Sequence, residues 1–546
     1  MKTDGNNAFI FQTRRIGDFF QSIPLIEFVT ASKENADIKH VDILIDESIY
    51  NVKDVFSRGI NFITYKSLLN YTDIPISADR LNELNLFLSD FTSKYEFAIN
   101  LNYDYTNSLF LSFFQNQKKG FIVLNKSSKT AESISKTGAA NYLFNIVKNR
   151  NLNRINIVDI YSLIGSEKPA EIKASYNIIN LKKQLKNKKR LIDGEPIRIC
   201  ISIGATHPKR IWQYENYAKL IKLLSKNLNC QIILVGTAEE KPAAEEIKKN
   251  IHLNDGVNIT DLTGKTNLQE LIYLIKDFDI IIASDTGTLH IAQIFNVPSV
   301  SIFTGNANFY ETGPHIENSY IIYSKTECYP CLQNETCRLN FACKNDINPE
   351  DVFNLTLMQV ASNKLGSAHK GGKIDLSDIK NRVEANVKKG NFSVAVCKHI
   401  DSVHFYPLRK QKINKTELAS EILKFCWINV LSNGSLKADK NKVLRYTNKY
   451  YKIDENTVNS LIREIYFIKT VFENGLKSFG CSHADVSYFE KFKDAVKSLG
   501  SNYNYLKLAC DYFMDELKSS GASKSFGDIL LLLNNALSIL NSFSFI

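Results

Sequence analysis

Three short turns in the second half of the chain combine small residues with charged ones. Each turn follows an apolar run that is typical of a buried strand; they are SIGATHPKR (202–210), VGTAEE (235–240) and SDTGT (284–288). In a parallel sheet such turns lie together at the carboxyl edge, where ligands bind and helix N-termini present unpaired N–H groups. The three turns therefore predict a binding site for a nucleotide diphosphate.

The residue types in these turns suit that ligand. Lys209 and Arg210 supply positive charge for a diphosphate, and Thr206 lies among small residues that allow close backbone approach. Glu239 begins a helix, where its carboxylate could accept hydrogen bonds from a ribose. Each feature also has a structural explanation, because Asp and Thr often cap helices and Glu is common in a first helical turn. The shared sheet edge favours the binding site over separate caps.

A second group with chemical potential is the cysteine cluster CYPCLQNETCRLNFAC, with the spacing C-x2-C-x5-C-x5-C. Its members are Cys328, Cys331, Cys337 and Cys343. Four thiolates can form a tetrahedral zinc or iron site. Disulfides are the alternative, which a reducing compartment disfavours. Such a site would be structural, because four protein ligands leave no open position.

The elements that must position these residues alternate between strands and helices. In the second half we expect strands at 197–204 and 231–236, and helices at 215–228, 239–250 and 267–276, before the strand and helix that flank 284–288. The first half opens with AFIFQTRRIGDFFQSIPLIEFV (8–29), a strand, a turn and a helix, and further strands are expected at 41–46, 61–65, 97–102 and 120–124. This alternation predicts two parallel-sheet domains of the Rossmann-like α/β type.

The expected organisation has four parts. Residues 1–165 form an N-terminal Rossmann-like domain, and 166–195 form a polar, charge-rich linker. Residues 196–360 form a second Rossmann-like domain, which carries the three turns and the cysteine cluster. Residues 370–546 form a mostly helical accessory domain, with one strand pair near 392–397 and 403–408. Two α/β halves joined by a polar connector suggest a ligand cleft between them.

Composition limits the class of protein. A chain of 546 residues, 44% of them hydrophobic, can build several cores. The net charge of +11 favours anionic partners but is too diffuse to indicate nucleic acid. Without a signal-like start or an apolar run of membrane-spanning length, we expect a cytoplasmic protein. LKKQLKNKKR (181–190) is most simply a solvated helix face, and peripheral contact with an anionic inner membrane is the sharper alternative.

Five blocks of the sequence resemble glycosyltransferase family 9, the heptosyltransferase-like enzymes. They are RRIGDFFQSIPLI, YEFAINLN, GATHPKRIWQYENYAKL, LVGTAEEKPAAEEI and DLTGKTNLQELIYLIKDFDIIIASDTGTLHIAQIFNVPSVSIF. The last block is the most specific, because Asp-Thr-Gly, His290, Ala292 and Val-Pro all fall at the family's spacing. The resemblance covers residues 8–355 and implies the GT-B architecture, two Rossmann-like domains that face a cleft, with the helical C-terminal domain as an addition. It also implies that 1–165 is the acceptor-side domain and that 196–360 is the nucleotide-sugar-binding domain.

The resemblance implies a role for Asp18 as the catalytic base. A carboxylate that faces the donor can take the proton from an acceptor hydroxyl, although Asp18 could also simply cap the helix that follows it. The resemblance also assigns Glu239 to the ribose and the turn 285–288 to the sugar and phosphates. The family's lysine two residues before Trp is Arg210 here, so whether Lys209 or Arg210 holds the leaving diphosphate stays open. The candidate substrate-binding residues are Arg14, Arg15, Gly17, Thr206, Lys209, Arg210, Glu239, Asp285, Thr286, Gly287, Thr288 and His290.

These features predict an inverting glycosyltransferase that needs no catalytic metal. The expected donor is a nucleotide-diphosphate sugar similar to ADP-heptose, and the acceptor is a hydroxyl on lipopolysaccharide, another glycan or a protein. Similar cysteine clusters occur in iron-containing members of the family, so iron stands beside zinc at the structural site. A sugar-nucleotide epimerase with a similar cleft and a non-catalytic nucleotide-sugar-binding scaffold are the alternative functions, and a homo-oligomer is left open.

Overall fold

The computed structural model describes most of the 546 residues. The residues outside the description are 1–6, 32–37, 58, 70–86, 124–133, 137, 174–175, 180–194, 252–256, 333–334, 364–374, 400, 437–438, 480–485, 521 and 544–546. The basic stretch 181–190, for which a solvated helix face or a membrane contact was predicted, lies outside the described residues.

The first half of the chain forms a six-stranded sheet in the order β3-β2-β1-β4-β5-β6. All neighbouring pairs from β3 to β5 are parallel, and β6 is antiparallel to β5. The strands are β1 (Asn7–Gln12), β2 (His40–Ile45), β3 (Ile60–Ile63), β4 (Tyr95–Asn100), β5 (Gln117–Val123) and β6 (Ile134–Lys136). The helices of this half are α1 (Ile16–Gln21), α2 (Ile23–Ala31), η2 (Glu47–Val55), α3 (Tyr65–Leu69), α5 (Tyr105–Ser112), α6 (Gly138–Ile146) and α7 (Ile157–Ser166).

The central strand β1 is apolar because helices cover both of its faces. Ala8 and Ile10 belong to the cluster that α1, α2 and α7 complete, whereas Phe9 and Phe11 pack among the aromatic side chains of β4 and α5. The chain then turns at the carboxyl end of β1 directly into α1, which places Asp18 at this sheet edge.

The second sheet has eight strands in the order β14-β13-β12-β11-β10-β7-β8-β9. The six strands from β7 to β12 are parallel, and β13 and β14 extend the sheet with antiparallel pairs. The strands are β7 (Ile197–Ser202), β8 (Cys230–Val235), β9 (Ile259–Asp261), β10 (Ile280–Ala283), β11 (Ser299–Phe303), β12 (Tyr320–Ser324), β13 (Phe392–His399) and β14 (Val403–Pro407). The helices of this half are η4 (Pro208–Arg210), α8 (Tyr214–Asn227), η5 (Ala238–Glu240), α9 (Lys241–Lys249), α10 (Leu268–Ile275), α11 (Gly287–Ile294), α12 (Phe309–Thr312), α13 (Ala342–Asn345), α14 (Pro349–Ser362) and α15 (Leu376–Lys389).

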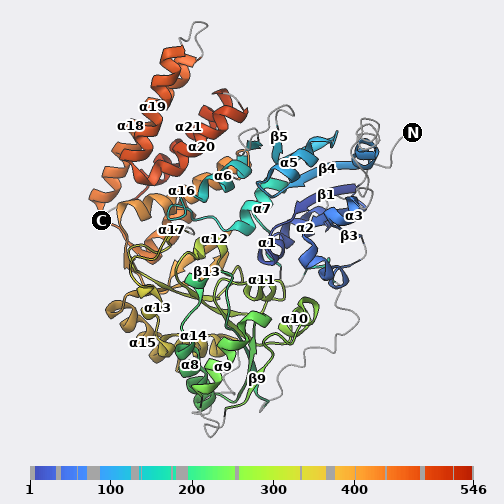
Figure 1. The fold of residues 1–546 in the computed structure, drawn as a ribbon. Coiled ribbons are helices and arrows are strands. Elements are labelled where there is room, and N and C mark those ends of the chain that lie inside the picture. The colour runs from blue at the N-terminus through green and yellow to red at the C-terminus, as the bar shows by residue number, and fades with distance from the viewer. Residues whose placement is uncertain are drawn as a thin grey trace.

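The two sheets with their covering helices confirm the α/β fold class and the GT-B arrangement (Figure 1). The strand pair expected near 392–397 and 403–408 is present as β13 and β14, and it is the edge of the second sheet. Residues beyond the expected boundary at 370 thus complete an element of the second half. The domain boundaries themselves stay a prediction.

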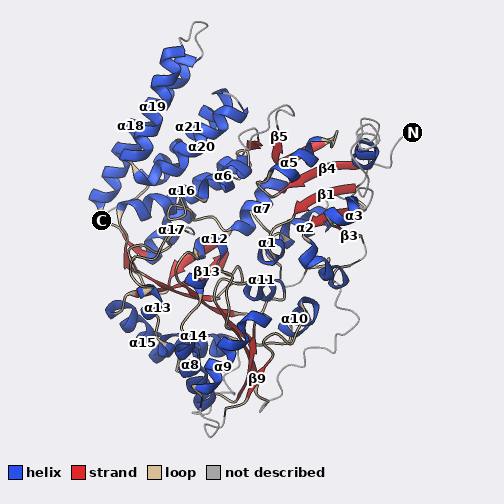
Figure 2. Ribbon diagram, viewed as in Figure 1, coloured by secondary structure: helices blue, strands red, loops and turns tan. Residues whose placement is uncertain are grey.

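The rest of the C-terminal region is helical, as predicted, and Figure 2 shows its helices beside the first half. It contains the small strand pair β15 (Gln411–Lys412) and β16 (Tyr451–Lys452) and the helices α16 (Lys415–Leu431), α17 (Lys440–Tyr450), α18 (Glu455–Phe479), α19 (Val486–Asn502), η8 (Asn504–Leu506), α20 (Lys507–Ser520) and α21 (Ala522–Leu540). The apolar stripe of α21 is mostly core, since Ile529, Leu533 and Leu540 are buried.

Helix α20 is fixed to helix α6 of the first half by side-chain hydrogen bonds. Asn141 Nδ2 donates to the Tyr512 carbonyl at 2.8 Å, and Asn145 Nδ2 donates to Asp515 Oδ2 at 3.1 Å. Asn141 and Asn145 are four residues apart on α6 and so share one helix face. The C-terminal helices are therefore built onto the first half, which turns its other side to the second sheet.

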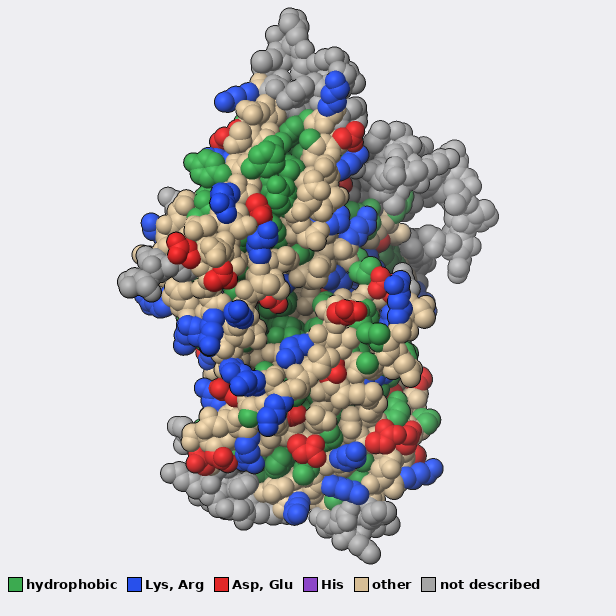
Figure 3. All heavy atoms as spheres, turned by 90° about the vertical axis from the view of Figure 1, so that its left-hand side faces the viewer, with side chains coloured by type: hydrophobic (Ala, Val, Ile, Leu, Met, Phe, Trp, Pro, Cys, Tyr) green, Lys and Arg blue, Asp and Glu red, His purple; other side chains and the backbone are tan. Residues whose placement is uncertain are grey.

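Charges are mixed on the face that Figure 3 presents. Lys and Arg side chains alternate there with Asp and Glu, and hydrophobic side chains run along the upper helices. This interspersed pattern agrees with the diffuse net charge of +11. Among the described residues, no helix is long and apolar enough to cross a membrane.

Candidate active site

A cleft of about 640 Å³ lies between the carboxyl edges of the two sheets. Its lining comes from both halves of the chain: Arg15, Ile16, Gly17, Asp18, Gln21, Val147, Lys148, Arg150, Ile157, Thr206, Arg210, Asp285, Thr286, Gly287, His290, Glu311, Thr312, Leu332 and Glu335. The structure therefore brings together most of the candidate residues, from turns that are more than 250 positions apart in the sequence. This is the placement that parallel-sheet topology predicts.

Two glycines allow the halves to meet at the floor of the cleft. Helices α1 and α11 pack against each other at their N-terminal ends. A Cβ atom on Gly17 would lie 2.8 Å from Cδ2 of His290, and a Cβ atom on Gly287 would lie 2.9 Å from Cγ2 of Ile16. Larger residues would push the helices apart, so these glycines set how closely Asp18 faces the second half.

Asp285 is held between two basic side chains of its own half. Arg210 Nη1 lies 2.6 Å from Asp285 Oδ2, and His290 Nε2 lies 3.3 Å from Asp285 Oδ1. Burial raises the pKa of this carboxyl, but Arg210 and His290 outweigh burial and bring the pKa to about 2. Asp285 is thus a permanent anion that orients Arg210 and His290 at the cleft wall.

Asp18 lies across the cleft in the first turn of α1 and is half-buried. Burial raises the pKa of its carboxyl above the usual value, while His290, Arg14 and a hydrogen bond from Tyr161 oppose the rise. Tyr161 Oη donates to Asp18 Oδ1 at 3.3 Å. A carboxylate with a raised pKa has a greater affinity for a proton, as a general base requires.

The turn at 284–288 also presents an unsatisfied hydroxyl to the cleft. Oγ1 of Thr286 is buried and has no hydrogen-bond partner within the described protein. Because buried hydroxyls are normally paired, this oxygen is suited to a ligand. Gly287 directly follows and begins α11, whose N-terminal N–H groups face the same side.

Several predicted residues lie away from the cleft lining. Arg14 donates to the Tyr103 carbonyl at 2.8 Å, and Thr288 is half-buried as the second residue of α11. Lys209 turns away, because its Nζ donates to the carbonyl oxygens of Leu332 (3.2 Å) and Glu335. Of the two basic neighbours, Arg210 rather than Lys209 lines the cleft.

Glu239 is exposed, whereas its neighbour Glu240 folds over the sheet edge. Glu240 Oε2 accepts a hydrogen bond from Thr237 N at 2.7 Å, and its carboxylate fills the space that a side chain on Gly204 would need. The signal for this was present in the sequence, because Thr237 and Glu240 have the spacing of a capping box. Glu240 is therefore the carboxylate at the corner between β7 and β8.

Other residues of the cleft were not predicted from the sequence. Arg150 Nε pairs with Glu311 Oε2 at 2.8 Å, and Arg150 Nη1 donates to the Asn306 carbonyl at 2.6 Å. This pair joins the first half to the second at the cleft wall. Arg150 lies in a polar connection with no motif around it, so its position depends on the tertiary fold.

The four clustered cysteines are free thiols that line one cavity of about 290 Å³, next to Lys209. The donor set suits zinc or iron chemically, because soft thiolates prefer these metals. Among the described residues, however, no group of three or more His, Cys, Asp or Glu side chains is arranged to hold a metal ion. Leu332 and Glu335 of this loop also line the cleft, so the loop is part of its wall.

The arrangement can support transfer from an activated donor. A carboxylate with a raised pKa lies on one side, and an arginine, helix N–H groups and a hydroxyl without a hydrogen-bond partner lie on the other. Such donors stabilise negative charge that develops on a leaving group.

Comparison with known proteins finds similar glycosyltransferases. Residues 93–341 match the family model of glycosyltransferase family 9 (heptosyltransferase). The chain is 26% identical over 335 residues to lipooligosaccharide heptosyltransferase 2 of Campylobacter jejuni, an alignment that spans 60% of this chain and 95% of that protein.

Solved structures of similar proteins include E. coli ADP-heptose LPS heptosyltransferase II, with 16% identity and a TM-score of 0.44 over 66% of this chain and 99% of that one. Another is the iron-containing dodecameric glycosyltransferase TibC from enterotoxigenic E. coli, with 13% identity and a TM-score of 0.39 over 66% of this chain and 80% of that one. The family-model match shows a glycosyltransferase family 9 domain within residues 93–341, and together with the alignment that spans 95% of a curated relative it supports a glycosyltransferase.

Proposed function

We propose that the protein transfers a heptose from an ADP-heptose-like donor to a hydroxyl of a lipopolysaccharide acceptor, with inversion at the anomeric carbon. The observation that carries the proposal is the position of Asp18, which faces the Asp285–His290–Arg210 corner across one cleft. The curated relative, named for heptosyl transfer to lipooligosaccharide, supports the choice of sugar and acceptor.

In the proposed reaction Asp18 takes the proton of the acceptor hydroxyl as its oxygen bonds to the anomeric carbon. The bond from that carbon to the diphosphate oxygen breaks, and the nucleoside diphosphate leaves with the electron pair. Arg210, the first N–H groups of α11 and the Thr286 hydroxyl stabilise the negative charge. Because these groups stabilise the leaving diphosphate, the proposed mechanism uses no divalent metal ion.

We assign the nucleoside side of the donor to the corner between β7 and β8. Glu240, rather than the exposed Glu239, is the carboxylate near Gly204 there, and Thr206 lies at the adjoining cleft wall. We assign Lys209 and Thr288 to the donor side, outside the cleft lining, and Arg14, Arg15 and Gly17 to the acceptor side.

The test is transfer by purified protein supplied with ADP-, GDP- and UDP-sugars and with core oligosaccharide. Asp18→Asn should lower kcat by at least about 100-fold while ADP binding is retained, because the amide cannot take a proton. Asp46→Asn is the matched control, since Asp46 only caps η2 and Asn is an equally good cap. Transfer by Asp18→Asn at the wild-type rate would exclude the base assignment, and donor conversion without acceptor would favour the epimerase.

A protein acceptor is the second candidate. The alignment with the curated relative spans 60% of this chain and 95% of that protein, so part of this chain has no counterpart there. The C-terminal helix α20 packs on α6 of the first half, the acceptor side, and enlarges it. Transfer of labelled sugar to a protein rather than to core oligosaccharide would decide for it. We place the reaction in the cytoplasm, peripheral to the inner membrane when the acceptor is a glycolipid. Flotation with anionic vesicles tests this placement, and sedimentation tests a homo-oligomer.

The cysteine loop is proposed as a structural zinc or iron site, because four free thiols line one cavity. Metal analysis of protein purified without oxygen should find about one ion per chain. Cys331→Ser should lose the ion, whereas Cys426→Ser should keep it, because Cys426 lies apart from the cavity and its thiol donates to a helix carbonyl as a serine can. Equal metal content in both variants would contradict the site.

A further inference from the structure

A directed line of hydrogen bonds leads to Asp18 from the backbone of the first sheet. It starts at the backbone N–H of Thr13, which donates to Oδ1 of Asn102 at 2.7 Å. A backbone N–H can only donate, so this contact determines which atom of the Asn102 amide is oxygen. The amide nitrogen of Asn102 consequently points the other way and must donate.

The direction continues through Gln12. Asn102 Nδ2 donates to Gln12 Oε1 at 2.8 Å, which leaves Gln12 Nε2 as a donor. Gln12 Nε2 donates to the carbonyl oxygen of Asp18 at 3.3 Å, and the Gln12 side chain is also a hydrogen-bond partner that lowers the pKa of the Tyr161 hydroxyl. A partner that lowers the pKa of a phenol donates to its oxygen, so the Tyr161 hydrogen is available for Oδ1 of Asp18, 3.3 Å away.

The members of this line are fixed by their elements. Gln12 ends β1, Asn102 follows its neighbour β4, and Tyr161 lies on α7. Gln12, Asn102 and Tyr161 are 0%, 1% and 3% exposed, so water does not compete for these bonds. Only Asp18, at the end of the line, belongs to the cleft lining.

We propose that Tyr161 is a positioning residue for Asp18, and that the line Thr13–Asn102–Gln12–Tyr161 aims its hydroxyl hydrogen at one carboxylate oxygen so that the other oxygen is left for the acceptor hydroxyl. This inference rests on the proposed function of Asp18 as the base. A tyrosine whose hydroxyl could rotate would hold the carboxylate less firmly, and the fixed direction removes that freedom.

The pH dependence of transfer should reflect the hydrogen bond from Tyr161 to Asp18. The groups that face Asp18 are His290 and Asp285 from the second half, Arg14 from its own turn and Tyr161 from α7. The hydrogen bond from Tyr161 favours the ionised carboxylate, so its loss must raise the pKa of Asp18 further. The base acts in its ionised form, so without this hydrogen bond the transfer activity should begin to fall at a higher pH as the solution is made more acidic.

The experiment compares Tyr161→Phe with Tyr142→Phe. Tyr142 is also a buried tyrosine of the first half, but its hydroxyl donates to Asn153 and lies outside this line. In Tyr161→Phe the acidic limb of the kcat profile should move up by about one pH unit, with ADP affinity unchanged. In Tyr142→Phe the acidic limb of the kcat profile should stay at the wild-type pH, even when this variant is as strongly destabilised as Tyr161→Phe.

Gln12→Glu provides a second variant, because a carboxylate cannot donate to Tyr161 and the hydroxyl hydrogen then has two competing acceptors. It should shift the acidic limb in the same direction although Tyr161 is retained. An unmoved limb in Tyr161→Phe would overturn the proposal.

A direct titration separates this inference from the proposed function. The carboxyl 13C signal of Asp18, assigned with Asp18→Asn, reports the pKa without turnover. A higher pKa in Tyr161→Phe than in Tyr142→Phe supports the hydrogen-bond line even if no donor is converted. Equal values overturn it even if transfer is robust.

Discussion

The charge of Asp285 depends on its neighbours rather than on solvent. The residue is 4% exposed, and its carboxylate contacts Arg210 at 2.6 Å and His290 at 3.3 Å. A buried carboxylate with such partners stabilises the folded state in its ionised form. The same contacts keep Arg210 at the cleft, so this ion pair links the stability of the fold to the diphosphate binding that we propose for Arg210.

Arg210→Gln should therefore lower the free energy of unfolding in a pH-dependent way. The pKa of Asp285 is about 2 in the folded protein and near its ordinary value in the unfolded chain, so its contribution is complete above pH ~4 and is lost as the pH falls towards 2. The contribution is about 2 kcal/mol. Urea unfolding should show the largest loss at pH 6 and a smaller one near pH 3.

The double variant Arg210→Gln/Asp285→Asn is the control for this prediction. It removes the unpaired buried charge, so part of the lost stability should return. A difference between wild type and Arg210→Gln that is constant from pH 6 to pH 3 would show that Asp285 is not the linked group.

The sequence did not show which of two adjacent polar residues faces the cleft. The turns at 202–210 and 235–240 were correctly placed at the sheet edge, but the direction of each side chain was not determined by the pattern. Lys209 and Glu239 are as polar as Arg210 and Glu240. Only the short 3-10 turns η4 and η5 decide which of two neighbours faces inward.

Helices α1 and α11 can approach each other closely because Gly17 and Gly287 have no side chains. Gly17→Ala should destabilise the protein by about 1–3 kcal/mol, because its Cβ would meet the His290 ring at 2.8 Å. Since the ring lies between the two halves, kcat should fall as well, through displacement of Asp18. Thermal unfolding and transfer kinetics measure both effects.

Gly527→Ala is the matched control for Gly17→Ala. Gly527 lies on α21 with nothing within 4 Å of the added Cβ, so the helix should gain about 0.5–1 kcal/mol. A similar gain in Gly17→Ala would mean that α1 and α11 tolerate a wider separation.

Elements were predictable where the apolar pattern is strong. The runs that became β1, β7, β8 and β10 are buried on both faces, so their composition alone indicates parallel strands. The strands β13 and β14 were also expected, but not their partner. A single apolar run does not specify which sheet edge it joins, and the edge at β12 lies about 70 residues earlier in the chain.

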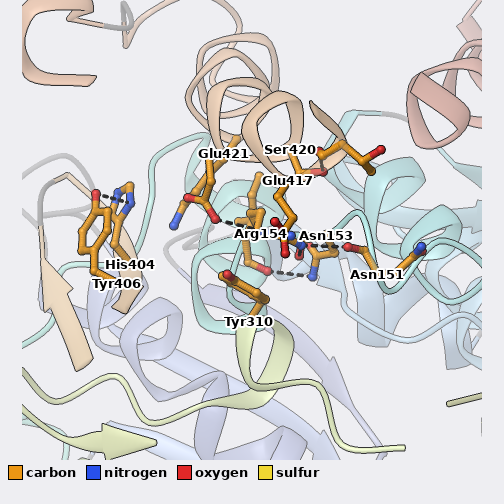
Figure 4. A network of polar contacts seen from close by, with 12 residues as sticks. Asn151, Asn153, Arg154, Tyr310, His404, Tyr406, Glu417, Ser420 and Glu421 are labelled. Atoms are coloured by element: carbon orange, nitrogen blue, oxygen red, sulfur yellow. Dashed lines mark hydrogen bonds and ion pairs between the residues drawn. The ribbon is translucent and has the colours of Figure 1, made fainter. Parts of the chain in front are cut away.

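A buried polar network connects the first half, the second half and the C-terminal helices of the molecule (Figure 4). Arg154 of the first half pairs with Glu421 of α16, Nε to Oε1, at 3.1 Å. The ring of Tyr310, from α12 of the second half, lies 4.1 Å from the Arg154 guanidinium carbon. The next residue, Glu311, lines the cleft, so the C-terminal helices are linked through Arg154 to the cleft wall.

The side chains of Arg154 and Glu421 are almost fully buried, so loss of one charge should destabilise the protein more than loss of both. Glu421→Leu leaves the Arg154 guanidinium without its carboxylate and should lower the free energy of unfolding by about 3–5 kcal/mol. Arg154→Met should also be destabilising, since Glu421 is then unpaired. The double variant should lose much less stability than the sum of the two single variants, because apolar side chains can replace a buried pair.

Chemical unfolding of the wild type, the two single variants and the double variant gives the coupling energy. Additive losses would mean that the pair does not hold the regions together, whereas strong coupling with a single unfolding transition would show that the C-terminal helices and the catalytic halves fold as one unit.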